Sequence, residues 1–339
     1  MRQVSFLRAP VFVWWNITLA CNLKCKQCYS ASGKPHPNEL NTEEAKQLIR
    51  ELGDMRVFYI YFLGGEPLQR KDFFELLAYT RDCRMAAMLS TNGWFITPDI
   101  AKRLEQLDVM HARVSIDGAT AATHDAIRGV SGSFERAINA VRYLKQTTIP
   151  RVGISHTVLA DNIGETESLI QQAVDLGVDE MQLVQLCNRG RAQKSYAASI
   201  DQLTELRQLF ARYRKQLTGV INLSATDGIY QSDAFLSGQG DTKYGIWGCP
   251  GTRTRASIEA EGTVQPCILN TTPAGNVREQ SFAEIWQTSP VFVAMRTVAP
   301  ECERCHYADV CARECPVDSC MDANYRRGFA KCSQRGGDG

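Results

Sequence analysis

The chain has 339 residues, a length that suits one large domain plus a small one. Its 38 basic and 37 acidic residues nearly balance, so no bulk charge favours nucleic acid or an anionic membrane as a partner. No apolar run reaches the roughly 18 residues that span a bilayer. Thirteen cysteines without a secretory signal indicate a reducing compartment, the cytoplasm, and metal ligation rather than disulfides.

Residues 11–216 alternate between strand-like and helix-like patterns. Apolar, β-branched or aromatic runs predict six strands, at Val11–Leu19, Val57–Leu63, Ala86–Ser90, Ala112–Ile116, Val152–Leu159 and Met181–Leu186. Asn41 and Glu44 can form a capping box at the start of the first intervening helix. Further helices are predicted to begin near Lys71, Pro98, Ser133, Glu165 and Ser199. Because parallel strands need such crossovers, the pattern predicts an α/β fold with reactive groups at the carboxyl ends of the strands.

The character of the chain changes near residue 219. Helical periodicity fades, glycine and cysteine become more frequent, and strand-like runs are short, as at Ala256–Glu259 and Thr263–Cys267. We therefore expect a core domain over residues 1–218, a small cysteine-rich domain over 219–334 and a mobile tail over 335–339. With little apolar core in the second domain, metal ligands are expected to contribute to its folding.

Cys21, Cys25 and Cys28 form a C-x3-C-x2-C group directly after the first predicted strand. Three thiolates at this spacing can hold three corners of a 4Fe–4S cluster, which normally takes four cysteines. One iron is then left open for a small molecule. A structural zinc ion is the alternative, but it needs a fourth local ligand, and the nearest one, His36, lies in a Lys-Pro-His-Pro turn.

This cysteine group, near the amino end and just after a strand, resembles that of the radical S-adenosylmethionine (radical SAM) superfamily. In that family the open iron binds the methionine moiety of SAM, and an electron from the cluster cleaves SAM to a 5′-deoxyadenosyl radical that abstracts hydrogen from a substrate. The resemblance implies a partial (β/α)6 barrel and an electron donor of the flavodoxin or ferredoxin type. One departure is Gln27, where the family often has an aromatic residue.

The segment Gly64-Gly65-Glu66-Pro67 follows the second predicted strand and resembles the GGEP run that contacts the SAM amino group in the family. Adjacent glycines let a backbone approach a ligand closely, and the glutamate adds a charged acceptor. The alternative is an ordinary strand-to-helix turn. Arg128 matches a family arginine that pairs with the SAM carboxylate, for which a planar guanidinium is suited; the alternative is a solvated surface residue.

Two further polar segments end predicted strands. Ser90 and Asn92 lie at the end of the third strand, and Ser115 and Asp117 at the end of the fourth. Short polar side chains at such ends can hydrogen-bond a ribose or a carboxylate, and the resemblance places Ser115 near the ribose and carboxylate of SAM. Asp117 is also explained by the turn that Asp-Gly favours.

The cysteines after residue 219 resemble the SPASM extension of radical SAM enzymes that mature peptides and some small molecules. Seven cysteines and a glycine follow its order: Cys249, Gly262, Cys267, Cys302, Cys305, Cys311, Cys315 and Cys332. The resemblance implies one auxiliary cluster on Cys302, Cys305, Cys311 and Cys332. It implies a second on Cys249, Cys267 and Cys315, with an open iron or a non-cysteine ligand. Cys320 is unassigned, and a pair of zinc sites is the alternative for the array.

Several segments, including TLACNLKC, VFYIYFLGGEP and SIDGATAATHDAIRG, resemble the mycofactocin maturases, peptide-modifying members of the family. This resemblance implies oxidative modification of a ribosomally made peptide by decarboxylation, crosslinking or desaturation. Only twenty residues precede Cys21, so a discrete peptide-recognition protein is expected to deliver such a substrate. The alternatives are oxidation or decarboxylation of a small molecule, such as a haem precursor, sugar or nucleoside, and a non-catalytic iron–sulfur electron carrier.

Overall fold

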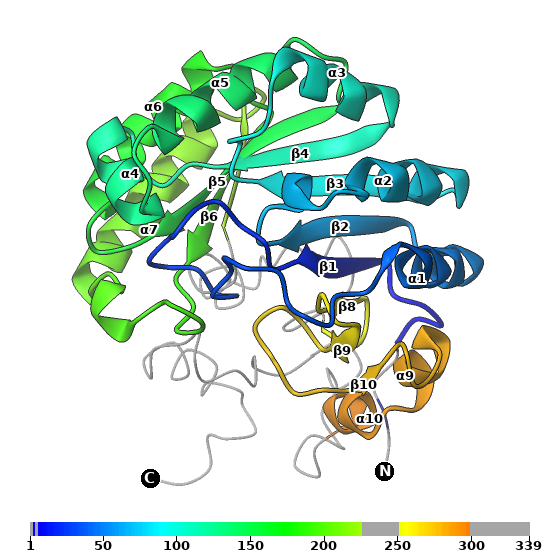
Figure 1. Cartoon of the computed structure of the whole chain (residues 1–339). Coiled ribbons are helices and arrows are strands. Elements are labelled where there is room, and N and C mark those ends of the chain that lie inside the picture. The colour runs from blue at the N-terminus through cyan, green and yellow to red at the C-terminus, as the bar shows by residue number, and fades with distance from the viewer. Residues whose placement is uncertain (1–2, 4–5, 226–250, 299–339) are drawn as a thin grey trace, which may run out of the picture.

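A single curved sheet organises the computed structural model, which describes residues 3, 6–225 and 251–298 (Figure 1). The ten strands are arranged in the order β10-β9-β8-β1-β2-β3-β4-β5-β6-β7. Pairing is parallel from β8 through β1 to β7 and antiparallel between β8, β9 and β10. Their bounds are β1 Phe12–Thr18, β2 Tyr59–Gly64, β3 Ala86–Thr91, β4 Val109–Ser115, β5 Arg151–Val158, β6 Glu180–Gln185, β7 Asn222–Ala225, β8 Arg255–Ile258, β9 Thr263–Gln265 and β10 Gly275–Asn276.

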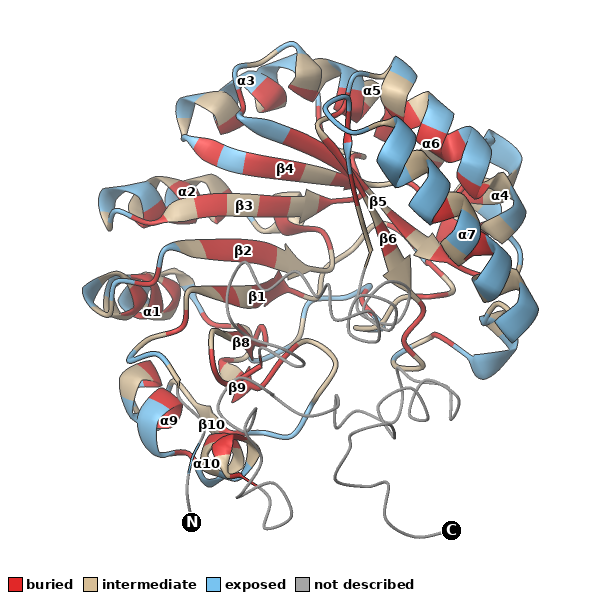
Figure 2. Ribbon diagram, turned by 180° about the vertical axis from the view of Figure 1, so that it is seen from behind, coloured by how far each residue is buried: buried red, intermediate tan, exposed pale blue. Residues whose placement is uncertain are grey.

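Helices cover the outer face of this sheet, as Figure 1 shows, which confirms the predicted α/β fold with parallel strands. The helices are α1 Thr42–Asp54, α2 Phe73–Asp82, α3 Pro98–Gln106, α4 Ala121–Arg128, α5 Ser133–Lys145, α6 Thr166–Asp175, α7 Ile200–Gln216, α9 Phe282–Thr288 and α10 Pro290–Arg296. Short 3-10 turns are η1 Pro67–Gln69, η2 Ile163–Glu165 and η3 Lys194–Tyr196. Buried residues concentrate on the strands and on the sheet-facing sides of the helices (Figure 2).

The core lies between the sheet and the helices because alternate strand residues point to opposite faces. In β1, Val13, Trp15 and Ile17 are fully buried in the main apolar cluster together with helix residues such as Leu48 and Leu52. The residues between them on β1 face the other side of the sheet. In β3 these alternating positions are only partly buried, and in β6 Glu180 is buried while Gln182 and Val184 are partly buried. The helix-facing side of the sheet therefore holds the apolar core, whereas the opposite side carries polar and aromatic residues that are buried or partly buried.

Local capping explains where α1 begins. The Asn41 side chain accepts from the backbone of Glu44, and the Glu44 carboxylate accepts from the backbone N–H of Asn41 at 2.8 Å, so the predicted capping box is confirmed. Arg278, which follows β10, donates to both oxygens of the same carboxylate at 2.7 Å. These charge-assisted bonds lower the pKa of Glu44 to about 2 and attach the segment after β10 to the start of α1.

The structure differs from the sequence-based expectation in two helical regions. Residues 121–128 were not predicted as a helix, yet they form α4, with Thr120 as its N-cap and Gly129 in the left-handed conformation at its end. The expectation that the chain after residue 219 has few helices and little apolar core is wrong for α9 and α10. Phe282, Trp286 and Phe292 from these helices are fully buried in the main core, so this part of the chain does contribute apolar packing.

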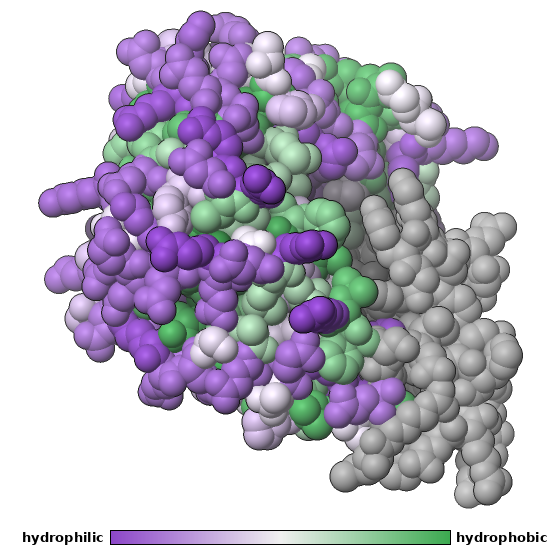
Figure 3. Space-filling view, turned by 90° about the vertical axis from the view of Figure 1, so that its right-hand side faces the viewer, coloured by the Kyte–Doolittle hydropathy of each residue, from purple (hydrophilic) through white to green (hydrophobic). Residues whose placement is uncertain are grey.

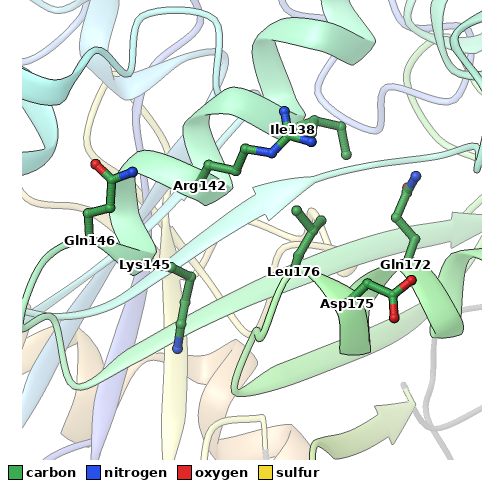
Figure 4. A pocket seen from close by; sticks show the side chains of 7 residues that line it. All are labelled: Ile138, Arg142, Lys145, Gln146, Gln172, Asp175 and Leu176. Carbon is green, nitrogen blue, oxygen red and sulfur yellow. The ribbon is translucent and has the colours of Figure 1, made fainter.

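The amino-terminal ends of the parallel strands form the face at the right of Figure 1, which Figure 3 shows from the front. Hydrophilic side chains cover most of this face, with hydrophobic atoms in a band between them. A groove of about 510 Å³ lies near these ends, between the last turns of α5 and α6, and Figure 4 shows its lining. Arg142, Lys145 and Asp175 line it together with Ile138 and Leu176. No residue predicted to be functional contributes to it.

Candidate active site

The cysteine loop, residues 19–33, arches from the end of β1 across the carboxyl ends of the strands (Figure 1). Its base is closed by hydrogen bonds from Cys21 N to Gly33 O at 3.0 Å and from Gly33 N to Leu19 O at 2.9 Å. Its far side is held by α4, because Lys24 N donates to Arg128 O at 3.1 Å. The loop that carries Cys21, Cys25 and Cys28 is therefore fixed by backbone contacts to separate parts of the fold.

Gly64 and Gly65 attach the end of β2 to the start of this loop. Gly65 N donates to Thr18 O, and Glu66 N donates to Ala20 O, both at 2.7 Å. A Cβ atom at Gly64 would overlap the carbonyl oxygen of Thr18, and one at Gly65 would overlap that of Ala20. Gly64 also has a φ of 121°, which side chains disfavour. The two glycines thus let the end of β2 approach the cysteine loop closely. The sequence alone did not reveal this structural role of the glycines.

Glu66 joins the ends of β2 and β3. Its fully buried carboxylate accepts from Thr91 Oγ1 at 2.8 Å, from Asn92 N at 2.7 Å and from Leu68 N at 3.2 Å. Burial raises the pKa of this carboxyl to about 7 despite these bonds. A carboxylate has about four acceptor sites, so Glu66 keeps capacity for one more donor.

Asn92 brings the end of β3 to the first cysteine. Its Nδ2 donates to Asn22 Oδ1 at 2.9 Å and lies 3.8 Å from Cys21 Sγ. Ser90 and Ser115 are half-buried on strands β3 and β4, on the face of the sheet opposite the helices. The polar positions predicted on β3 and β4 therefore lie at the same edge as the cysteine loop.

Asp117 and Arg128 form a buried pair behind Cys25. Arg128 Nη2 lies 2.6 Å from Asp117 Oδ2, and Arg128 Nη1 lies 3.8 Å from Cys25 Sγ. Gln27 Nε2 donates to the same Asp117 oxygen, and Thr157 N donates to the other at 2.7 Å. Burial opposes the charged guanidinium, but Asp117 and Cys25 outweigh it and raise the pKa of Arg128. Asp117 thus holds Arg128 and Gln27 in place.

The segment after β6 also holds the cysteine loop, although no sequence motif indicated this role. Arg191 N donates to Cys28 O at 2.9 Å, and the Arg191 side chain donates to Cys25 O at 2.9 Å and to Ser32 O at 2.6 Å. A Cβ atom at Gly190, whose φ is 65°, would overlap the carbonyl oxygen of Cys28. The sequence feature that could have indicated this contact is the pair Gly190-Arg191 just after a predicted strand.

The residues of the cysteine loop fit an iron–sulfur cluster with a polar ligand beside it. Three buried polar atoms around the loop have no hydrogen-bond partner within the described residues: Asn22 Nδ2, Gln27 Oε1 and Arg128 Nε. Buried polar groups are normally paired, so these atoms indicate a bound group that completes the site. In the described ranges, no three His, Cys or acidic side chains converge on one metal ion, whereas a cluster binds each thiolate through a different iron.

The pKa values of the three thiols in the loop are shifted in different directions. Burial raises the pKa of Cys21 to about 11 and also raises the pKa of Cys25. At Cys28, hydrogen bonds from Ser30 and Ser32 and the charge of Arg191 outweigh burial and lower the pKa. Metal ligation deprotonates such thiols outright. The cations beside Cys25 and Cys28 favour the thiolate state that ligation requires.

A second polar network links the cysteine loop to the SPASM-like region. Tyr29 Oη donates to Asn16 Oδ1 at 2.7 Å, and Asn16 Nδ2 donates to Glu259 Oε2 at 2.8 Å. Arg189 Nη2 lies 3.5 Å from Glu259 Oε1, and Arg189 also donates to the carbonyl of Ile268. Residues from β1, the cysteine loop, the β8–β9 turn and the segment after β6 thus meet beside Cys267.

Cys267 is the one predicted auxiliary-cluster ligand within the described residues. Its sulfur accepts from Leu269 N at 3.4 Å and from Asn270 N at 3.2 Å. Hydrogen bonds to sulfur are typical of cluster ligands, whose reduction potential they tune. The other predicted ligands lie outside the described residues: Cys249, Cys302, Cys305, Cys311, Cys315 and Cys332.

Comparison with known protein families identifies the family to which the chain belongs. Residues 15–174 match the radical SAM superfamily, and residues 249–316 match the SPASM family, described as an iron–sulfur cluster-binding domain. An AdoMet-dependent heme synthase of Methanosarcina barkeri is 33% identical over 91% of this chain and 92% of its own length. The chain belongs to the radical SAM superfamily. This radical SAM protein is therefore an enzyme that uses SAM, a 4Fe–4S cluster and auxiliary iron–sulfur clusters, and the electron-carrier alternative no longer applies.

Other relatives of this radical SAM enzyme differ in function. The mycofactocin maturase MftC of Mycobacterium tuberculosis is 34% identical over 91% of this chain and 79% of its own length. Among solved structures, Streptococcus suis SuiB bound to the precursor peptide SuiA has a TM-score of 0.76 at 19% identity and covers 92% of this chain and 73% of that one. The similarity to MftC bears out the predicted resemblance, and the similarity to SuiB supports the fold.

The described part of the radical SAM enzyme contains no helix that is both long and apolar enough to cross a membrane.

Proposed function

We propose that Cys21, Cys25 and Cys28 ligate the 4Fe–4S cluster at which this enzyme cleaves SAM. The observation that carries this proposal is the convergence of the cysteine loop, Glu66 and the Asp117–Arg128 pair at one edge of the sheet. Around them, buried polar atoms have no hydrogen-bond partner in the part of the chain that the structure describes. When bound and reduced, the cluster supplies the electron that cleaves SAM to a 5′-deoxyadenosyl radical.

The surrounding side chains bind and orient SAM in this proposal. The backbone of Gly64 to Pro67 and the spare acceptor capacity of Glu66 suit the SAM amino group. Arg128 suits the SAM carboxylate because its Nε has no partner among the described residues, while its other nitrogens face Asp117 and Cys25. Ser90, Asn92 and Ser115 are proposed to contact the remaining polar groups of SAM, whereas Asp117 contributes by holding Arg128.

The C-terminal region is proposed to hold the auxiliary clusters. We assign one to Cys302, Cys305, Cys311 and Cys332, and one to Cys249, Cys267 and Cys315. The backbone N–H groups directed at the Cys267 sulfur support its role as a ligand. The domain division at residue 218, with the small domain over 219–334 and the tail over 335–339, belongs to the same proposal.

For the substrate, we propose a ribosomally made peptide that is oxidatively decarboxylated, crosslinked or desaturated. The similarity to MftC over most of the chain supports this class. A haem precursor is the second candidate, because heme synthases of Methanosarcina barkeri and Nitratidesulfovibrio vulgaris are 33% and 34% identical over 91% and 88% of the chain. In the first case a discrete protein is proposed to deliver the peptide. In both, a flavodoxin- or ferredoxin-type protein in the cytoplasm supplies the electron.

Replacing Cys25 with alanine tests the assignment of the SAM-cleaving site. Anaerobically reconstituted Cys25→Ala protein should form no 5′-deoxyadenosine from SAM and reductant, while it keeps the iron of the auxiliary clusters. Cys83→Ala is the matched control, because Cys83 lies at the end of α2, away from the cysteine loop. Chromatographic assay of 5′-deoxyadenosine at the wild-type rate in Cys25→Ala would refute the assignment.

Mass spectrometry separates the two substrate classes. The enzyme, SAM and reductant are incubated with a candidate precursor peptide or with a haem precursor that carries propionates. Loss of CO2 or of two hydrogens from the peptide alone supports the peptide proposal. The same change in the tetrapyrrole alone overturns it in favour of the second candidate.

A further inference from the structure

Arg191, on the segment after β6, contacts two of the three cysteines proposed to ligate the SAM-cleaving cluster. Its backbone N–H donates to Cys28 O at 2.9 Å, and its side-chain Nε donates to Cys25 O at 2.9 Å. Its Nη1 donates to Ser32 O at 2.6 Å, near the base of the cysteine loop. One residue therefore holds the backbone of two ligands, and its planar guanidinium supplies the side-chain donors in a fixed geometry.

The segment that carries Arg191 is itself fixed by packing on both sides. Gly190 lies so close to the cysteine loop that a Cβ atom there would overlap the carbonyl oxygen of Cys28. Ala192 is 7% exposed and belongs to a small apolar cluster that also contains Ile127 of α4. The place of Arg191 beside the cluster ligands is therefore set by the fold.

The positive charge of Arg191 differs from that of the other arginines around the cysteine loop. Arg128 pairs with Asp117, and Arg189 Nη2 lies 3.5 Å from Glu259 Oε1, so carboxylates compensate both charges. Within the described residues, no carboxylate pairs with Arg191, and its guanidinium bonds to carbonyl oxygens instead. Its charge therefore acts on its surroundings without compensation from this part of the chain.

The lysines of the cysteine loop are expected to act more weakly on the cluster. Lys26 forms an ion pair, and Lys24 and Lys34 are exposed, so water and salt screen their charges. Arg191 is half-buried, and its charge is one of the causes that lower the pKa of Cys28. A partly buried charge is screened less than an exposed one, so Arg191 contributes most of the net positive field at this loop.

We propose that Arg191 is a positioning residue that also makes the cluster on Cys21, Cys25 and Cys28 easier to reduce. In this reduction, one electron leaves the flavodoxin- or ferredoxin-type donor and enters the cluster, which gains one negative charge while no bond or proton is exchanged. A positive charge beside the cluster stabilises this more negative state, and net charge is among the factors that set a cluster's reduction potential. The inference rests on the proposed function and deepens it, because it names a residue that governs the electron transfer required for SAM cleavage.

Redox titration of the full-length, cluster-loaded protein, followed by EPR spectroscopy, tests this inference. Titanium(III) citrate serves as the reductant, and the titration follows the reduced-cluster signal that SAM alters and that is absent from Cys25→Ala. In Arg191→Gln, the equilibrium constant for one-electron reduction of this cluster should fall about tenfold. This change corresponds to a midpoint potential lower by about 59 mV.

Further variants separate the charge of Arg191 from its shape. Arg191→Met is as neutral as Arg191→Gln and should lower the midpoint potential in the same way. Arg191→Lys keeps the charge but not the planar group, so its potential should stay closer to that of the wild type. Arg142→Gln removes an exposed arginine on α5 and is the matched control, which should leave the potential unchanged.

Three outcomes would overturn the inference. The first is a wild-type midpoint potential in both neutral variants. The second is a potential as low in Arg191→Lys as in Arg191→Gln, which would assign the effect to geometry alone. The third is loss of the SAM-sensitive signal from all three Arg191 variants, which would show that the side chain only shapes the loop.

Loss of the signal from the two neutral variants but not from Arg191→Lys would support the inference, since the cluster would then require the charge. A SAM-sensitive signal that persists in Cys25→Ala would refute the assignment of the SAM-cleaving site instead. Failure of that assignment and failure of this inference are therefore distinguishable.

Discussion

The carboxylate of Asp117 contacts groups from three separate parts of the chain. It accepts from Gln27 in the cysteine loop and from Thr157 at the end of β5, and it pairs with Arg128 at the end of α4. The side chain of Asp117 is fully buried. A buried charge that loses its partner is costly. Arg128 therefore depends on Asp117 both for its position and for neutralisation of its buried positive charge.

Asp117→Asn should therefore weaken SAM binding without removing the cluster. The amide keeps the shape of the side chain but cannot neutralise Arg128, so the guanidinium is expected to turn away from Cys25. We expect the Kd for SAM, measured by equilibrium dialysis, to rise about tenfold. The free energy of unfolding should fall by about 3 kcal/mol.

Asp82→Asn is the control for this prediction, since the pair of Asp82 with Arg81 is solvent-exposed and contributes little. Iron content should be unchanged in both variants. A wild-type Kd for SAM in Asp117→Asn would show that Arg128 is held in place without this carboxylate.

Sequence patterns predicted the positions of these residues but not their partners. Arg128 was predicted to bind SAM from the motif resemblance, and Asp117 from its position at the end of a strand. The structure shows that they bind each other and that Arg191 holds the same loop. Such contacts join residues that are far apart in the sequence, for example Cys25 and Arg191. They depend on the order of the strands in the sheet, which no local pattern contains.

At the scale of elements, a charged cluster joins β4, β5 and β6 near their amino-terminal ends. Glu180 on β6 contacts Arg113 and His111 on β4 and Arg151 on β5. A Cβ atom at Gly153 would lie 3.0 Å from the Glu180 side chain, so the small residue on β5 gives this carboxylate its space. The cluster thus ties three neighbouring strands together on the face of the sheet opposite the helices.

His111→Phe should change how stability depends on pH. Burial, followed by the charge of Arg113, lowers the pKa of His111 from 6.5 to about 4. Between these values the unfolded chain takes up a proton that the folded protein does not, so the wild type loses stability as the pH falls. Relative to His111→Phe, it should lose about 2 kcal/mol between pH 7 and pH 5.

Anaerobic thermal unfolding of both proteins at a series of pH values measures this difference. The clusters are common to the two proteins, so their own pH dependence cancels in the comparison. A difference in stability that stays constant from pH 7 to pH 5 would contradict the lowered pKa of His111.

Strands were easier to predict than the short helices. β1, β3 and β6 lie within about one residue of their predicted bounds, because a buried parallel strand reads as a continuous apolar run. α4 is only Ala121–Arg128, follows a polar turn and has few apolar residues, so its pattern was too weak. In α9 and α10, the nearby glycines and cysteines outweighed an apolar pattern that was present at Phe282, Trp286 and Phe292.

At the scale of the whole molecule, the sheet joins the two regions that the sequence appeared to separate. β7 begins at Asn222 and pairs with β6, and β8 pairs with β1 in parallel. The polar network from Tyr29 to Arg189 reaches the carbonyl next to Cys267. The candidate SAM site and this predicted auxiliary ligand are thus connected through the fold.

Cys311→Ala should separate SAM cleavage from product formation. Loss of one auxiliary cluster lowers the iron content by roughly four atoms per chain. Formation of 5′-deoxyadenosine should continue, because the cysteine loop at residues 19–33 is unchanged, while the modified substrate is no longer formed. Iron analysis and chromatography of the same samples measure both. Full product formation in Cys311→Ala would show that this cluster is dispensable, and Cys83→Ala provides the control.

The pairing of β1 with β8 has a consequence for synthesis on the ribosome. Phe12 is aligned with Arg255, so one edge of β1 stays uncovered until the translating ribosome has added more than two hundred further residues. At about 5 to 20 residues per second, this delay is roughly 10 to 50 seconds. During that time an apolar strand with two tryptophans presents an open edge, which is a hazard for aggregation. Nascent chains of this enzyme should therefore need chaperone protection until β8 emerges.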